Sequence, residues 1–168
     1  MKNERNVCIW LADYLPSHKE WPEKMLDSKC AAGFLLVWPI YEQKLFAGFL
    51  EGKEIKDYAR HYMTFYDELD VDDIAKEFHL RYQNPHHRKG MNLRGANLLP
   101  ILNKPFKALT DYEKTHFLMH IVFRYRNNIF HGNKRIDEWE FYEKEINYCL
   151  QFMMALLQCA KDHQNYQS

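Results

Sequence analysis

An arginine and a histidine near residue 130 are the residues of this chain best suited to chemistry on a phosphate. Arg126 and His131 have four residues between them, with Asn127 directly after the arginine and Gly132 directly after the histidine. Histidine donates or accepts protons near neutral pH, and arginine stays charged and can hold phosphate oxygens in bidentate fashion. Asn127 could orient the imidazole or bind phosphate itself. Arg126, Asn127 and His131 are therefore the candidate catalytic residues.

The segment 123–135 resembles the signature of the HEPN domain family, which is all-α and carries such a motif at the end of a late core helix. The upstream segment 34–42 is similar to the family's first core helix, an aromatic and apolar run closed by an acid, Glu42. The resemblance implies a metal-independent endoribonuclease without a cofactor, with His131 in proton transfer and Arg126 on the phosphate.

The same resemblance implies partners. Single-stranded or structured RNA would be the substrate, and two copies would form a homodimer whose motifs face each other across a shared cleft. Toxins and phage-defence effectors of the family suggest that role here, with an antitoxin or another partner protein. Some HEPN toxins carry a tyrosine two residues after the histidine that a partner nucleotidyltransferase modifies. This chain has Asn133 there, so control by that modification is not expected.

Other side chains around the motif are candidates for binding the substrate. Arg124 lies on the same helical face as His131 by spacing, and the full set is Arg124, Asn128, Lys134, Arg135 and Glu42. A second basic patch is formed by Arg81, Arg88, Lys89 and Arg94 around the pair His86 and His87. Two local patches could follow a phosphate backbone on a protein of no net charge.

Helical geometry limits how the motif can work. At about 100° per residue, Asn127 and His131 share a face, whereas Arg126 and His131 point roughly 140° apart. In an unbroken helix these two side chains could not converge on one small group. Either the helix loosens at residues 130–131, before Gly132, or a second protomer completes the site.

Three other interpretations remain open. The fold could be a binding or dimerisation module that holds nucleotide or RNA through Arg126 and His131 without cleaving it. Both side chains could instead bond the last free carbonyls of a helix, as helix-ending residues often do. The third is a metal enzyme, because the spacing of Glu113, His116 and His120 places all three on one helical face, as metal ligands in a bundle would be. We expect this face to be partly exposed and to bind no metal.

Composition bounds the class of protein. The chain of 168 residues is 46% hydrophobic and 27% charged, and 23 basic residues balance 23 acidic ones. This excludes a disordered chain and a protein held to nucleic acid by its overall charge. The N-terminus shows no signal-peptide pattern, and the longest apolar stretch is too short to span a bilayer. We expect a cytoplasmic protein with no membrane association, whose four cysteines are reduced structural thiols.

The elements that must position the motif are predicted to be helices. We expect residues 1–27 to be an N-terminal arm and 28–168 to be a single HEPN-like domain, an all-α bundle of four to five principal helices. A helix from Ser28, apolar nearly all round and so buried, should be kinked or split at Pro39. Further helices are predicted over 54–69, 71–78, 95–102, 110–131 and 137–163, with a loop over 83–94. A capping box, Thr110 to Glu113, opens the helix that carries the motif.

Overall fold

The computed structural model describes residues 28–46, 48–93, 98–130 and 142–165, and in these ranges every regular element is a helix. The predicted all-α class is therefore confirmed for the described part of the chain. The predicted arm over residues 1–27 lies outside it. Within the same ranges, no helix combines the length and the apolar character needed to cross a bilayer.

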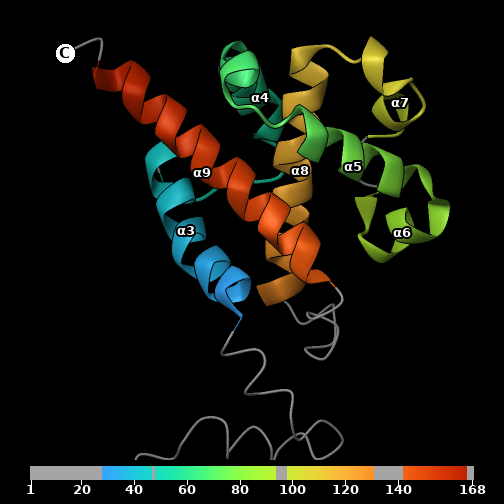
Figure 1. The fold of residues 1–168 in the computed structure, drawn as a ribbon, viewed down its shortest axis with the longest axis horizontal. Coiled ribbons are helices and arrows are strands. Elements are labelled where there is room, and N and C mark those ends of the chain that lie inside the picture. The colour runs from blue at the N-terminus through green and yellow to red at the C-terminus, as the bar shows by residue number, and fades with distance from the viewer. Residues whose placement is uncertain (1–27, 47, 94–97, 131–141, 166–168) are drawn as a thin grey trace, which may run out of the picture.

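Helix α3 (Lys29–Leu45) and helix α9 (Glu143–Asn165) lie side by side although they are far apart in sequence (Figure 1). Ser28 caps α3 by accepting a hydrogen bond from the Ala31 amide at 3.2 Å, and its hydroxyl also donates to Glu143 of α9 at 3.4 Å. Gly33 allows the helices to approach closely, because a Cβ there would lie 2.8 Å from Leu150 Cδ2.

The expected kink or split at Pro39 is wrong as to the split, because α3 runs unbroken through this residue, and a kink stays a prediction. Pro39 lies on the exposed side, where water can reach the carbonyl that proline leaves without its amide partner. The expectation that α3 is buried all round is also wrong, since Leu36 is 71% exposed and Ile40 is 50% exposed. Only the face with Phe34, Trp38 and Tyr41 is in the core.

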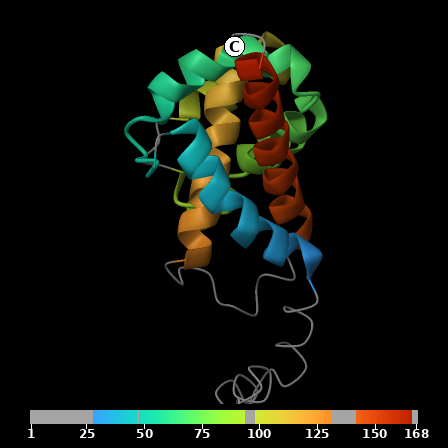
Figure 2. The same cartoon turned by 90° about the vertical axis from the view of Figure 1, so that its left-hand side faces the viewer.

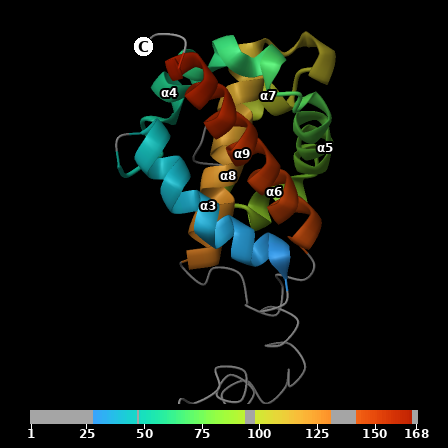
Figure 3. The same cartoon turned by 60° about the vertical axis from the view of Figure 1, so that its left-hand side comes forward.

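Helix α8 (Asp111–Phe130) is the buried centre of the fold. Every residue from 115 to 122 is buried, and α8 contacts α4 (Ile55–Tyr62), α5 (Asp72–Gln83), α9 and the 3-10 helix η1 (Met63–Glu68). Figure 2 shows α8 behind α3, and Figure 3 shows α9 crossing in front of α8. The predicted capping box is confirmed: Thr110 Oγ1 accepts from the Glu113 amide at 3.3 Å, and Glu113 Oε2 accepts from the Thr110 amide at 3.1 Å.

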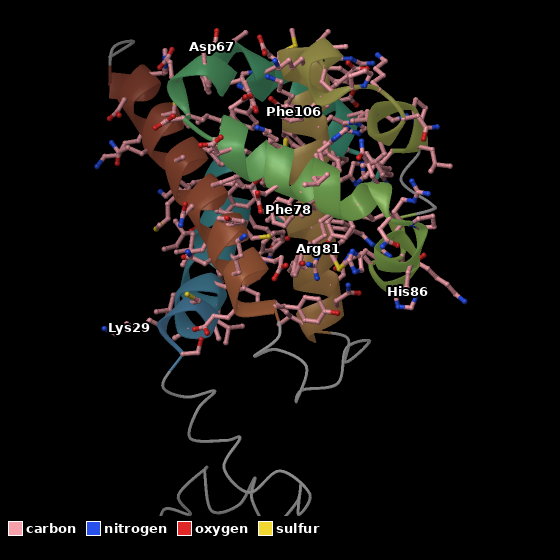
Figure 4. The ribbon with its side chains drawn as sticks, turned by 45° about the vertical axis from the view of Figure 1, so that its right-hand side comes forward. Lys29, Asp67, Phe78, Arg81, His86 and Phe106 are labelled. Atoms are coloured by element: carbon pink, nitrogen blue, oxygen red, sulfur yellow. The ribbon has the colours of Figure 1, made fainter. Side chains whose placement is uncertain are left out.

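The remaining elements cover the other side of α8. Residues 54–69, predicted as one helix, form α4 followed by η1. Tyr58 and Tyr62 of α4 donate to the carbonyls of Phe46 and Leu45 at 3.3 and 2.7 Å, which ties α4 to the end of α3. Helix α5 is longer than the predicted 71–78. Its Phe78 points into the core, whereas His86 lies on the surface (Figure 4).

The predicted loop over 83–94 contains a short helix instead, α6 (Pro85–Gly90). Asn84 caps it by accepting from the His86 amide at 2.9 Å, and Pro85 occupies the first helical position, where its missing N–H is not needed. Helix α7 (Leu99–Leu102) and the 3-10 helix η3 (Phe106–Ala108) connect to α8, and a hydrogen bond of 3.2 Å from the buried His79 ring to the Ile101 carbonyl joins α7 to α5.

Candidate functional site

Arg126 projects from the last turns of α8 toward α3. The carbon at the centre of its guanidinium group lies 5.6 Å from the ring centre of Trp38 and 5.6 Å from that of Phe49. Both distances are within the range of cation–π attraction. The two rings differ in their surroundings, because Trp38 is buried in the core and Phe49 is 63% exposed. The half-buried guanidinium group is therefore held by aromatic side chains at the border between core and solvent.

Asn127, the second candidate catalytic residue, contacts its neighbour directly. Arg126 Nη1 donates a hydrogen bond of 2.9 Å to Asn127 Oδ1. Because the bond fixes one edge of the guanidinium while the aromatic rings lie against it, the plane of the group is oriented from two directions. Asn127 is thus placed to position Arg126.

Glu42 organises the aromatic side of this site. Its Oε2 accepts a hydrogen bond of 2.8 Å from Trp38 Nε1, and its Oε1 accepts one of 3.1 Å from the Leu50 amide. The second bond fixes the chain immediately after Phe49. Glu42, predicted to bind substrate, therefore holds in place both aromatic residues that contact Arg126.

Arg124 and Asn128 lie on a different face of α8. Arg124 Nε donates to the Met91 carbonyl at 3.1 Å, and Asn128 Nδ2 donates to Met91 Sδ at 3.2 Å. Burial lowers the pKa of the Arg124 guanidinium from its usual value. Both side chains are predicted to bind substrate, and in the structure they hold Met91, the residue that follows α6. The end of α8 therefore has one face toward Trp38 and another toward Met91.

The third candidate catalytic residue, His131, lies outside the described residues, as do the predicted substrate-binding residues Lys134 and Arg135. The predicted angle between Arg126 and His131 therefore stays a prediction. In the second basic patch, Arg94 also lies outside the described part. Arg81 forms an ion pair of 2.8 Å with Glu145 of α9, and Figure 4 shows it beside that helix.

The alternative metal ligands Glu113, His116 and His120 have other contacts. The Glu113 carboxylate accepts hydrogen bonds from the Lys104 ammonium group and from the Thr110 amide of the helix cap. The two histidines are buried, with 4% and 6% exposure, because α4 packs across this face of α8, so the expected partly exposed face is wrong. Burial is the main cause that lowers the pKa of His116 to about 4 and that of His120 to about 3. Cationic neighbours, Lys56 among them, act in the same direction.

Sequence reasoning did not predict the contact of Arg126 with Trp38 and Phe49. The aromatic run 34–42 and Phe49 are visible in the sequence. Their pairing with a residue more than seventy positions away depends on how α3 packs against α8. The only local signal is the four-residue spacing of Trp38 and Glu42, which places an indole N–H and a carboxylate one helical turn apart.

The described part of the chain is all-helical, and near the end of its central helix an oriented arginine lies between two aromatic rings, one of them exposed. A search with protein-family models gives no match for this chain, and neither do searches of curated proteins and of solved structures.

Proposed function

We propose that this protein is a metal-independent endoribonuclease of the HEPN type. Arg126 holds the scissile phosphate and His131 transfers protons. The observation that carries the proposal is the fixed guanidinium of Arg126, held by Trp38, Phe49 and Asn127. An arginine oriented before its ligand arrives stabilises phosphoryl charge more effectively than a mobile one, because no reorganisation is needed during the reaction.

The exposed ring of Phe49 supports RNA as the ligand. A phenylalanine that is 63% exposed beside a guanidinium offers a stacking surface for a base next to a group that binds the phosphate. Stacking on aromatic rings combined with positive charge is the usual way in which proteins bind single-stranded nucleic acid. The substrate we propose is therefore single-stranded RNA or an unpaired segment of structured RNA.

The chemistry needs only the residues of the motif. A histidine takes the proton of the 2′-OH, and the oxygen attacks the adjacent phosphorus. The bond from phosphorus to the 5′-oxygen then breaks, and a protonated histidine supplies the proton to that oxygen. The products are a 2′,3′-cyclic phosphate and a 5′-hydroxyl. In a homodimer with facing motifs, the His131 of each protomer would take one of these two roles.

The order of helices agrees with this proposal. In the part of the chain that the structure describes, an aromatic helix that contains Glu42 (α3) comes first, Arg126 and Asn127 of the motif lie near the end of the long helix α8, and one further long helix (α9) follows. As a HEPN-type ribonuclease, the protein would act as a toxin or an antiviral effector and would be controlled by a partner protein.

A cleavage assay in excess EDTA tests the proposal. The purified full chain should cut single-stranded RNA and leave 2′,3′-cyclic phosphate ends, and a substrate with 2′-hydrogen at the cut position should stay intact. Circular dichroism in the same buffer would verify that the helices persist. Activity that is lost in EDTA and restored by a metal, with the fold intact, would exclude the metal-independent mechanism.

One observation favours a second candidate function, a module that binds RNA or nucleotide without cleaving it. Arg126 and Phe49 are enough to hold a phosphate and a base, and neither of them transfers protons. Tight RNA binding without fragments, with or without added metal, would assign the protein to this class.

A further inference from the structure

Three side chains with different donor atoms converge at the end of the fold away from Arg126. They are Glu68, the last residue of η1, and Cys159 and His163 of α9. Their ligand atoms all lie within 4.8 Å of one another. Glu68 Oε2 is 3.5 Å from Cys159 Sγ and 3.0 Å from His163 Nε2. Figure 4 shows the neighbouring Asp67 close to the C-terminal part of α9.

Local geometry explains why the three groups meet. Cys159 and His163 are four residues apart, so they lie on the same face of α9 one turn apart. In η1, Phe65 and Glu68 are three residues apart and therefore point the same way, because a 3-10 helix has three residues per turn. The Phe65 ring stacks on the His163 ring at 4.5 Å with an angle of 16° between the planes. This stacking fixes the plane of the imidazole whose Nε2 faces Glu68.

Two of the three distances between ligand atoms are close to those around one small metal ion, and the third, between the Cys159 sulfur and the His163 ring nitrogen, is at most 4.8 Å. Zn²⁺ binds thiolate sulfur at about 2.3 Å and imidazole nitrogen or carboxylate oxygen at about 2.0–2.2 Å. In a tetrahedron these bond lengths separate neighbouring ligand atoms by roughly 3.3–3.7 Å. The sulfur–oxygen distance of 3.5 Å already has this value. The nitrogen–oxygen distance of 3.0 Å must lengthen by a few tenths of an ångström, and the exposed Glu68 side chain can move by this amount.

We propose that Glu68, Cys159 and His163 bind a zinc ion, with water as the fourth ligand. Sulfur, nitrogen and oxygen donors in one small site favour zinc over magnesium or calcium, which prefer oxygen ligands only. Cys159 would bind as the thiolate, releasing its proton to solvent. The bound ion would fasten η1 to the last turns of α9. Cys159 would then have a role beyond that of a structural thiol.

Binding of Co²⁺ to the full chain tests this site, because cobalt replaces zinc and absorbs in the near ultraviolet only when a thiolate is a ligand. The metal-free protein, kept reduced, should take up one Co²⁺ with that absorption and lose it to one equivalent of Zn²⁺. His163→Gln and Glu68→Gln should each weaken Zn²⁺ binding at least about tenfold, measured by competition with a zinc indicator. Cys159→Ser should abolish the absorption.

Matched controls separate this site from the other cysteines and histidines. Cys30→Ser removes a half-buried thiol near the opposite end of α9, and His61→Gln removes an exposed imidazole on α4, so both should bind as the unaltered chain does. If Cys159→Ser does not fold, the two variants at exposed or half-exposed positions decide the question. Zinc binding only at millimolar concentration, or unchanged binding in His163→Gln and Glu68→Gln, would overturn the proposal.

Discussion

Glu42 of α3 and Arg126 of α8 contact the same side chain, Trp38, one at its edge and the other at its face. The Glu42 carboxylate accepts the indole N–H at 2.8 Å, and the Arg126 guanidinium lies 5.6 Å from the ring centre. The position of the Trp38 indole therefore depends on the Glu42 carboxylate and in turn determines where the Arg126 guanidinium can lie. A substitution of any one of these three residues should change the side-chain positions of the other two.

The hydrogen bonds of Glu42 should be measurable as stability. Glu42→Ala removes the acceptor of the Trp38 indole and of the Leu50 amide, and we expect the free energy of unfolding to fall by about 1–3 kcal/mol in urea titrations. Glu42→Gln, which keeps one carbonyl acceptor, should lose less. Equal stability of all three proteins would mean that neither bond contributes.

Arg126 should matter for RNA more than for folding. Arg126→Ala should abolish cleavage in the EDTA assay while the far-ultraviolet circular dichroism stays helical, and Arg126→Lys should recover little, because an ammonium lacks the planar fork that binds phosphate. If Arg126→Ala unfolds the protein, the role of this arginine is to complete the core beside Trp38. For comparison, Arg124→Ala should lower stability, because it removes the donor to the Met91 carbonyl.

A second copy of the chain should complete the site. Light scattering at micromolar concentration should give about twice the monomer mass of 20.4 kDa. Because Leu36 is the most exposed apolar residue of α3, at 71% exposure, Leu36→Ser should shift the mass toward the monomer, whereas Leu80→Ser on α5, at 68% exposure, serves as a matched control without effect. A strictly monomeric protein that still cleaves RNA would rule out a composite site.

The two buried histidines of α8 should make stability depend on pH. Their pKa values, about 4 for His116 and about 3 for His120, lie below the ordinary value of 6.5. As the pH falls below 6.5, the unfolded chain binds protons that the folded chain does not. The free energy of unfolding should therefore fall, by at most about 1.4 kcal/mol per pH unit for each histidine, until the folded protein itself titrates near pH 4.

Urea titrations between about pH 7 and about pH 4.5 would measure this slope. The double variant His116→Gln and His120→Gln should show a shallower dependence than the unaltered chain, and each single variant should show an intermediate one. A slope that persists in the double variant would assign the dependence to other groups.

Local sequence signals predicted local structure well. The cap at Thr110 and Glu113 depends on residues three positions apart, and it forms as expected. Asn84 and Pro85 are an equally local pattern for the start of a helix, but the polar residues around them favour the prediction of a loop. Pro39 is also a local signal, for a helix break, yet α3 runs unbroken through it and packs against α9, a segment far away in the sequence.

The candidate site was predictable only in part. The motif and Glu42 could be found from residue types and spacing, but the side chains that link them could not. Arg126 and Arg124 are two residues apart and have different partners, Trp38 and Met91. Contacts between helices decide which face of α8 lies against each partner. The same holds for Glu68, whose approach to Cys159 requires η1 to pack against α9.

The packing of α3 against α9 also constrains how the chain acquires its fold. Ser28 and Glu143, which are bonded across this interface, are 115 positions apart, whereas the contacts of α4 with η1 and of α5 with α6 are local. Contacts between distant segments form slowly, because a long loop must close first. During synthesis, α3 leaves the ribosome long before α9 exists, and Phe34, Trp38 and Tyr41 stay uncovered in the meantime. Until the last long helix has been made, the nascent chain therefore exposes an aromatic segment that the folded protein buries.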